Sequence, residues 1–229
     1  EQHLLYSFLI SPVKNELEEK TNILVVPGGL LWYLPIETLC AESGKYILQD
    51  KNVSYFSSSD ISGIINNKGM KKSHTVLTAF GAPSGIDLPF SAAEVRAIGR
   101  IFAGSSVFIG DNASKVNFLK YAPSSSIIHI ATHSHLDKKE INNSYIRFAG
   151  SDGILKLGEI YGIHLPASSL VVLSSCESAL GDDAPGAEFA SLGTAFGTAG
   201  ASSVIASLWK VEDSSCAMLF EEFYKNLKA

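Results

Sequence analysis

The sequence is poor in charged residues and in long apolar runs, and each shortage argues against a class of protein. Only 18% of the 229 residues are charged, the formal net charge is -5, and lysines and arginines form no cluster. Nucleic-acid surfaces need clustered cations that displace counterions from phosphates. No apolar stretch approaches the roughly 20 residues that span a bilayer, and the first residues lack the basic lead of a signal peptide. We therefore expect a cytoplasmic protein that contacts neither nucleic acid nor membrane directly.

Cysteine is also scarce, which excludes two further kinds of structure. Cys40, Cys176 and Cys216 are an odd number and widely spaced, so they predict neither a disulfide framework nor a thiolate metal site. At least one thiol is therefore free. The chain begins with glutamate inside an apolar-periodic segment, so we expect a fragment of a longer polypeptide. With 46% hydrophobic residues, it can bury a sizeable core unaided.

From Thr75 onward, apolar strands alternate with amphipathic helices. We predict strands at 75–80, 105–109, 126–132, 169–175 and 202–207, helices at 91–102, 113–121, 187–199 and 213–228, and a hairpin joining 145–148 to 153–157. This alternation is typical of a parallel sheet with helices on both faces. Ser91 and Glu94 form the pattern of a capping box at the start of the first of these helices.

The first 72 residues form a less regular N-terminal part, and residues 73–229 form the α/β core. In the N-terminal part we predict an amphipathic helix at 4–19, a buried strand at 22–26, and short strands at 34–38 and 53–56.

Two of the predicted core strands run directly into reactive side chains, His133 and Cys176. In an open parallel sheet, ligands bind beyond the carboxyl ends of the strands, so both residues face one crevice if the two strands are neighbours. An imidazole that takes the proton of a thiol turns it into a nucleophile. Backbone N–H groups just after His133 and at Cys176 could stabilise the resulting oxyanion. The alternative for Cys176 is an inert core thiol, which is our expectation for Cys216.

The histidines allow a second interpretation. His129, His133 and His135 alternate along the strand and could form a zinc site, which would predict a metal-dependent hydrolase. Zinc ligands usually come with carboxylate or thiolate partners nearby, so we favour His129 as a hydrogen-bonded, partly buried residue and expect no metal or cofactor. A dinucleotide fingerprint needs its glycines after a strand and at the start of a helix. The order is reversed for Gly193, Gly197 and Gly200, which lie within and after a predicted helix and before a strand, so we assign them to helix packing.

The segment His129-Ile130-Ala131-Thr132-His133, followed by Leu170 to Ser178, resembles the CHAT family of caspase-like peptidases, with caspases and separases as more distant relatives. The likeness continues through Gly186-Ala187-Glu188 and Val204 to Trp209, and covers nearly the whole chain. It implies an α/β caspase-like three-layer sandwich with a mostly parallel central sheet. It also implies a catalytic dyad of His133 and Cys176, and fusion to tetratricopeptide (TPR) or other sensor repeats.

The function implied by this resemblance is that of a cysteine endopeptidase acting on a protein substrate, controlled by a sensor or TPR region in cis or in trans. The oxyanion hole then uses the backbone of Ser134 and Cys176, although the family usually has glycine where Ser134 stands. Candidate residues of the substrate pocket are Ser174, Glu177, Asp152, Asp182 and Asp183, and we expect 181–186 to be a mobile loop. The alternative is a catalytically silent, caspase-like interaction module.

Overall fold

The computed structural model describes residues 2–28, 31, 34–56, 75–137, 140–174, 187–207 and 211–228, with the main chain alone at 141 and 187–191. The chain divides into two compact units, residues 1–71 and 72–229. In the part of the chain so described, no helix has the length and apolar character needed to cross a membrane.

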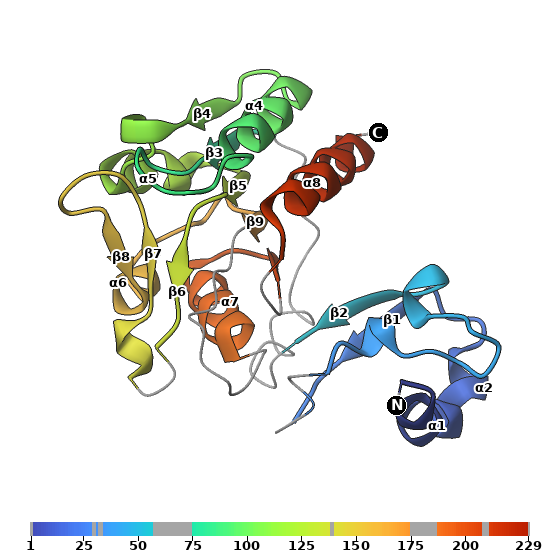
Figure 1. Cartoon of the computed structure of the whole chain (residues 1–229). Coiled ribbons are helices and arrows are strands. Elements are labelled where there is room, and N and C mark those ends of the chain that lie inside the picture. Colours follow the sequence, from blue (N-terminus) through green and yellow to red (C-terminus); the bar gives the residue numbers. More distant parts are fainter. Residues whose placement is uncertain are drawn as a thin grey trace. The chain divides into compact units, whose positions relative to one another are not determined.

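The smaller unit pairs two short strands beside broken helices (Figure 1). It contains α1 (Gln2–Leu9), η1 (Ser11–Val13), α2 (Lys14–Leu17), β1 (Asn22–Val25), η3 (Ile36–Thr38), η4 (Ile47–Gln49) and β2 (Asn52–Tyr55). The continuous helix predicted for 4–19 is wrong, because it is interrupted by η1, whose second residue, Pro12, has no N–H to donate into the preceding turn. Among the described residues, strand β1 pairs with the parallel β2 alone, and it is half-exposed and not the buried strand predicted.

The strand predicted at 34–38 is also wrong, because this segment forms the 3-10 helix η3. The Thr38 hydroxyl donates to the Pro35 carbonyl at 2.8 Å, and the Ile36 N–H donates to the Tyr55 hydroxyl at 2.7 Å. These bonds satisfy polar groups that a strand would have given to a neighbour. The turn buries Ile36 and Leu39 in the small core of this unit.

The larger unit is built on a five-stranded parallel sheet in the order β10-β9-β5-β3-β4. The strands are β3 (Leu77–Phe80), β4 (Ser106–Phe108), β5 (Ile127–Ile130), β9 (Leu170–Leu173) and β10 (Val204–Ala206). All five lie inside the ranges that the sequence predicts. The three central strands are buried at every position, as expected for parallel strands covered on both faces.

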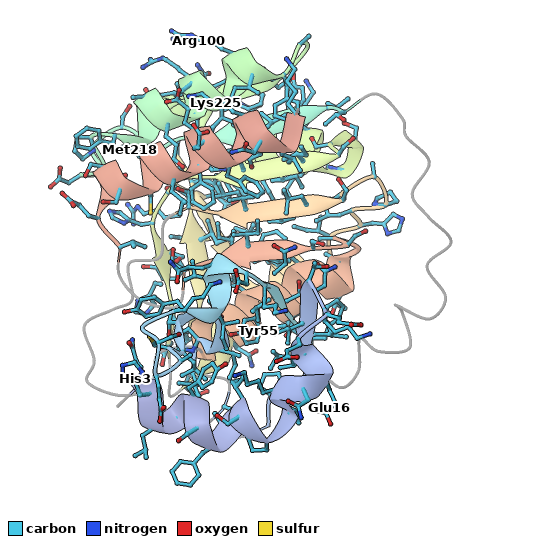
Figure 2. All side chains as sticks on the ribbon, turned by 90° about the vertical axis from the view of Figure 1, so that its right-hand side faces the viewer. His3, Glu16, Tyr55, Arg100, Met218 and Lys225 are labelled. Atoms are coloured by element: carbon cyan, nitrogen blue, oxygen red, sulfur yellow. The ribbon has the colours of Figure 1, made fainter. Side chains whose placement is uncertain are left out.

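Helices cover both faces of this sheet, which completes the three layers of a caspase-like fold (Figure 1). Helices α4 (Ser91–Ile101) and α8 (Asp213–Lys228) pack side by side on one face, with the outward Met218 and Lys225 of α8 labelled in Figure 2. The other face holds α5 (Lys115–Tyr121), α6 (Leu157–Tyr161) and α7 (Ala187–Ala199). The predicted α/β sandwich with a parallel central sheet is therefore confirmed.

A three-stranded antiparallel sheet follows the central strand β5. Its strands are β6 (Ser134–His135), β7 (Tyr145–Arg147) and β8 (Ile154–Lys156), in the order β6-β7-β8. The predicted hairpin corresponds to β7 and β8, whereas β6 was not predicted. Gly153 is required in this hairpin, because a Cβ there would lie 2.1 Å from the Phe148 carbonyl oxygen. Since β6 begins one residue after His133, the small sheet anchors the chain where β5 ends.

Candidate functional site

The two strands that lead to the proposed dyad are direct neighbours. Strands β5 and β9 pair in parallel, with Ile130 opposite Leu173 at their carboxyl ends. In the sequence, His133 comes three positions after Ile130, and Cys176 comes three positions after Leu173. Neighbouring strands are about 4.8 Å apart, so this register starts both segments from adjacent points on one edge of the sheet. Cys176 itself lies outside the described residues, as do Glu177 and the segment 181–186 with Asp182 and Asp183.

The main chain at His133 is tied to β7. The Arg147 N–H donates to the His133 carbonyl oxygen at 2.8 Å, and the buried Thr132 hydroxyl donates to the Arg147 carbonyl oxygen at 2.6 Å. The His133 side chain is half-buried. Hydrogen bonds to Arg147 therefore fix the main chain at Thr132 and at His133, and the half-buried imidazole extends from this fixed position.

Ser134 adopts extended backbone in β6 and faces Ile146 of β7. Because the neighbouring Arg147 N–H bonds to His133, the Ser134–Ile146 pair is one in which the backbone groups do not bond to each other. The Ser134 N–H therefore points away from β7. Extended backbone does not need the positive φ of glycine, so serine at this position is compatible with the observed conformation.

A buried carboxylate lies beneath the carboxyl ends of β5 and β9. Glu94 of α4 is 2% exposed, and its Oε1 accepts hydrogen bonds from the His129 Nε2 at 2.9 Å and from the Ser174 hydroxyl. The Tyr224 hydroxyl of α8 lies 3.1 Å from the other ring nitrogen of His129. Burial and the Glu94 charge raise the pKa of Tyr224, so its hydroxyl stays protonated. Side chains from α4, from α8, from β5 and from the residue after β9 thus meet in one hydrogen-bond network.

The capping box predicted for Ser91 and Glu94 is wrong. Helix α4 has no side-chain cap. The Ser91 hydroxyl donates to the Ala131 carbonyl oxygen at 2.5 Å and accepts from the Ala82 N–H at 2.7 Å. Ser91 and Glu94 form hydrogen bonds with groups of the sheet instead of capping the helix. The strand ends that pack against the first turn of α4 carry buried polar groups, and such groups need hydrogen-bond partners.

Ser174 and Asp152 are the two proposed pocket residues that the structure describes. Ser174 is buried, and its hydroxyl is directed to Glu94 on the α4–α8 face. The Asp152 side chain is 96% exposed and lies 3.8 Å from the Lys115 Nζ, which has a closer partner in Glu159 at 2.8 Å. Lys115 lowers the pKa of that glutamate. A role in substrate binding remains a prediction for both pocket residues.

The histidines do not gather as a zinc site would require. Both ring nitrogens of His129 contact protein groups, Glu94 and Tyr224, and the His135 ring packs on Tyr145 with 5.2 Å between ring centroids. Within the described ranges, no three histidine, cysteine or acidic side chains are grouped as metal ligands. His129 is 0% exposed, so it is fully buried and not partly buried as predicted.

The two cysteines within the described residues are buried thiols. Cys216 of α8 lies in the core against the sheet, as predicted, and Cys40 lies in the core of the smaller unit. Burial, followed by the negative charges of Glu94 and Asp213, raises the pKa of Cys216 to about 11. A protonated, buried thiol is a poor nucleophile at neutral pH.

Sequence reasoning missed the roles of Glu94 and Tyr224. A signal for Glu94 was present, because it lies next to Val95 on the stripe of α4 that also buries Ser91 and Ile98. A carboxylate on the buried stripe of a helix needs an internal partner. The sequence pattern does not say which partner, since His129 is 35 residues away along the chain.

The parallel sheet, the helices on both of its faces and the small antiparallel sheet after β5 define a caspase-like α/β domain. Compared with known families, the chain matches the CHAT domain over residues 2–229, and it belongs to this family. The match includes both compact units. Among curated proteins, the comparison found no match.

Proposed function

We propose that this CHAT domain is a cysteine endopeptidase in which Cys176 is the nucleophile and His133 is the general base. The observation that supports this most directly is the β5–β9 register, because it starts the segments to His133 and to Cys176 from paired residues of neighbouring strands. Two short segments of equal length, leaving one sheet edge together, can bring an imidazole to a thiol.

The proposed chemistry needs no group beyond the chain and water. His133 accepts the thiol proton, and the thiolate attacks the carbonyl carbon of a peptide bond. The oxyanion that forms accepts hydrogen bonds from the N–H groups of Ser134 and Cys176. His133 then gives its proton to the departing amine. Water, deprotonated by His133, hydrolyses the thioester and restores the thiol.

The substrate and the control of this activity are further parts of the proposal. The family resemblance supports a protein substrate and a sensor or TPR region in cis or in trans. Ser174, Glu177, Asp152, Asp182 and Asp183 are the proposed residues of the substrate pocket. A segment that links β9 to α7 and contains the nucleophile is a suitable place for activation by a partner.

A covalent probe tests the dyad without knowledge of the substrate. The chain is treated with a set of peptidyl acyloxymethyl ketones that differ in P1 residue, and the modified cysteine is located by mass spectrometry. We expect modification of Cys176, and a rate reduced about 100-fold or more in His133→Ala. Since Cys40 and Cys216 are buried, they serve as internal controls.

Two outcomes would contradict the proposal. One is equal labelling of Cys176 in wild type and His133→Ala, which would indicate an ordinary exposed thiol. The other is no labelling by any probe, with and without the attached sensor region, which would favour a silent interaction module. Proteolysis of a peptide library by wild type, lost in Cys176→Ala and retained in Cys216→Ala, completes the test.

A further inference from the structure

The first turn of α4 is bonded to the ends of three neighbouring strands. The Ser91 hydroxyl bonds to Ala82, just beyond β3, and to Ala131, just beyond β5. Glu94 bonds to His129 within β5 and to Ser174, just beyond β9. A helix that only packs on a sheet would use apolar side chains for these contacts. Here a hydroxyl and a carboxylate make directional bonds at the carboxyl edge.

The Glu94 carboxylate is shared between the two strands that matter for the dyad. His129 lies four positions before His133, and Ser174 lies two positions before Cys176. Both donors bond to the same oxygen, Oε1, so a shift of either strand end along its axis would break one of the two bonds. Such bonds are strong because water is excluded, with Glu94, His129 and Ser174 all buried.

Helix α8, which packs beside α4 on the same face of the sheet, supports this arrangement. Tyr224 contacts His129, as described above, and the Asp213 carboxylate accepts the N–H of Phe90, the residue before α4, at 2.7 Å. The position of Glu94 is thus fixed by the helix that contains it and by the helix beside it. A rigid support of this kind is what a catalytic pair needs, since an error of about 1 Å can reduce a rate about 100-fold.

We propose that Glu94 is a positioning residue that holds the carboxyl ends of β5 and β9 in fixed register, so that His133 and Cys176 meet in reactive geometry. The inference rests on the proposed peptidase function. Glu94 touches neither substrate nor the reacting atoms; it acts through His129 and Ser174.

The test uses the full chain and the variants Glu94→Gln and Ser174→Ala. Glutamine keeps the shape of Glu94 but loses the charge, and serine to alanine removes only one hydroxyl. The matched control is Thr78→Val, which removes a buried hydrogen bond of 2.6 Å to the Ser125 hydroxyl, in the amino-terminal half of β3. Each protein is studied by hydrogen exchange of segments 127–135 and 170–176, and by the kinetics of inactivation with the best peptidyl probe.

We expect hydrogen exchange to become faster in both segments of Glu94→Gln and of Ser174→Ala. The maximal inactivation rate constant should fall about tenfold or more in both variants, because alignment is lost. In Glu94→Gln the probe's dissociation constant should stay within about twofold of wild type. Ser174 is itself a proposed pocket residue, so Ser174→Ala is judged by exchange and by the rate constant. Thr78→Val should match wild type in both measurements. If Glu94→Gln does not fold, Ser174→Ala alone decides the question.

The proposal is overturned if the two segments of Glu94→Gln and Ser174→Ala exchange at the wild-type rate. It is also overturned if Thr78→Val reduces the inactivation rate as much as these two variants do. A larger dissociation constant of the probe for Glu94→Gln, with an unchanged maximal rate constant, would also overturn it, because it would make Glu94 a binding residue. If the wild-type Cys176 is never labelled, the peptidase function fails, and the exchange measurement alone then decides whether Glu94 holds both strand ends.

Discussion

The buried pair of Glu94 and His129 predicts a large non-additive effect on stability. In His129→Leu, Glu94 keeps only the Ser174 hydroxyl as a hydrogen-bond partner, and removing one partner of a buried hydrogen bond costs about 1–3 kcal/mol. In Glu94→Met, the ring N–H of His129 and the Ser174 hydroxyl lose their acceptor, which costs about 1–3 kcal/mol for each group left unsatisfied. The double variant removes the carboxylate and the imidazole together, so neither group stays buried without the other.

We therefore expect the double variant to be less destabilised than the sum of the single variants by at least about 1 kcal/mol. The slowest-exchanging amides of β5 and β9 report the free energy of opening of the larger unit by itself, which avoids mixing it with unfolding of the smaller unit. Thr78→Val combined with His129→Leu serves as the control and should be additive. Additivity within about 0.5 kcal/mol for Glu94 and His129 would show that the pair is not coupled and would refute the reasoning.

Three further predictions follow from single contacts. Tyr224→Phe keeps the ring packing but removes the hydroxyl beside His129, so it should destabilise by about 1–2 kcal/mol in the same exchange assay; no loss would mean that this hydroxyl bond is not formed. Cys216, with its pKa raised to about 11, should stay unlabelled by iodoacetamide at pH 8 in the folded chain and react on unfolding; rapid native labelling would contradict its burial. Gly200→Ala places a Cβ 2.9 Å from the Leu165 carbonyl oxygen at φ +118, so its melting temperature should fall, whereas Gly197→Ala, exposed within α7, should raise it slightly; equal effects would contradict the φ assignment.

Strands and long helices were predictable because their signals are local. The continuous apolar runs of β5 and β9 and the amphipathic pattern of α8 depend on neighbouring residues alone, and their predicted ranges contain the observed elements. Local patterns failed where a distant partner decided the outcome. The segment 34–38 has strand-like residues, yet a bond from Ile36 to Tyr55 supports a 3-10 turn there.

In the candidate site, too, local features could be predicted from the sequence and contacts between distant residues could not. Reactive residues at strand ends could be recognised from the sequence, but the pairing of β5 with β9 had to be seen in the structure. Ser91 and Glu94 have the spacing of a capping box, and no local rule predicts that Ala131 and His129 will bind these side chains instead. The side-chain geometry of Cys176 remains a prediction, because this residue lies outside the described part of the chain.

The contact between α4 and α8 has a consequence for the order of folding during synthesis. The N–H of Phe90 bonds to Asp213, which is 123 residues later, and His129 meets Tyr224, which is 95 residues later. A ribosome therefore releases α4 and β5 well before the helix that covers them. Until α8 arrives, His129 lacks its tyrosine partner and the apolar side chains around Val172 remain uncovered on that face. We expect the nascent chain to need protection from aggregation over this interval, and the strand ends that lead to His133 and Cys176 to become rigid only after α8 has packed.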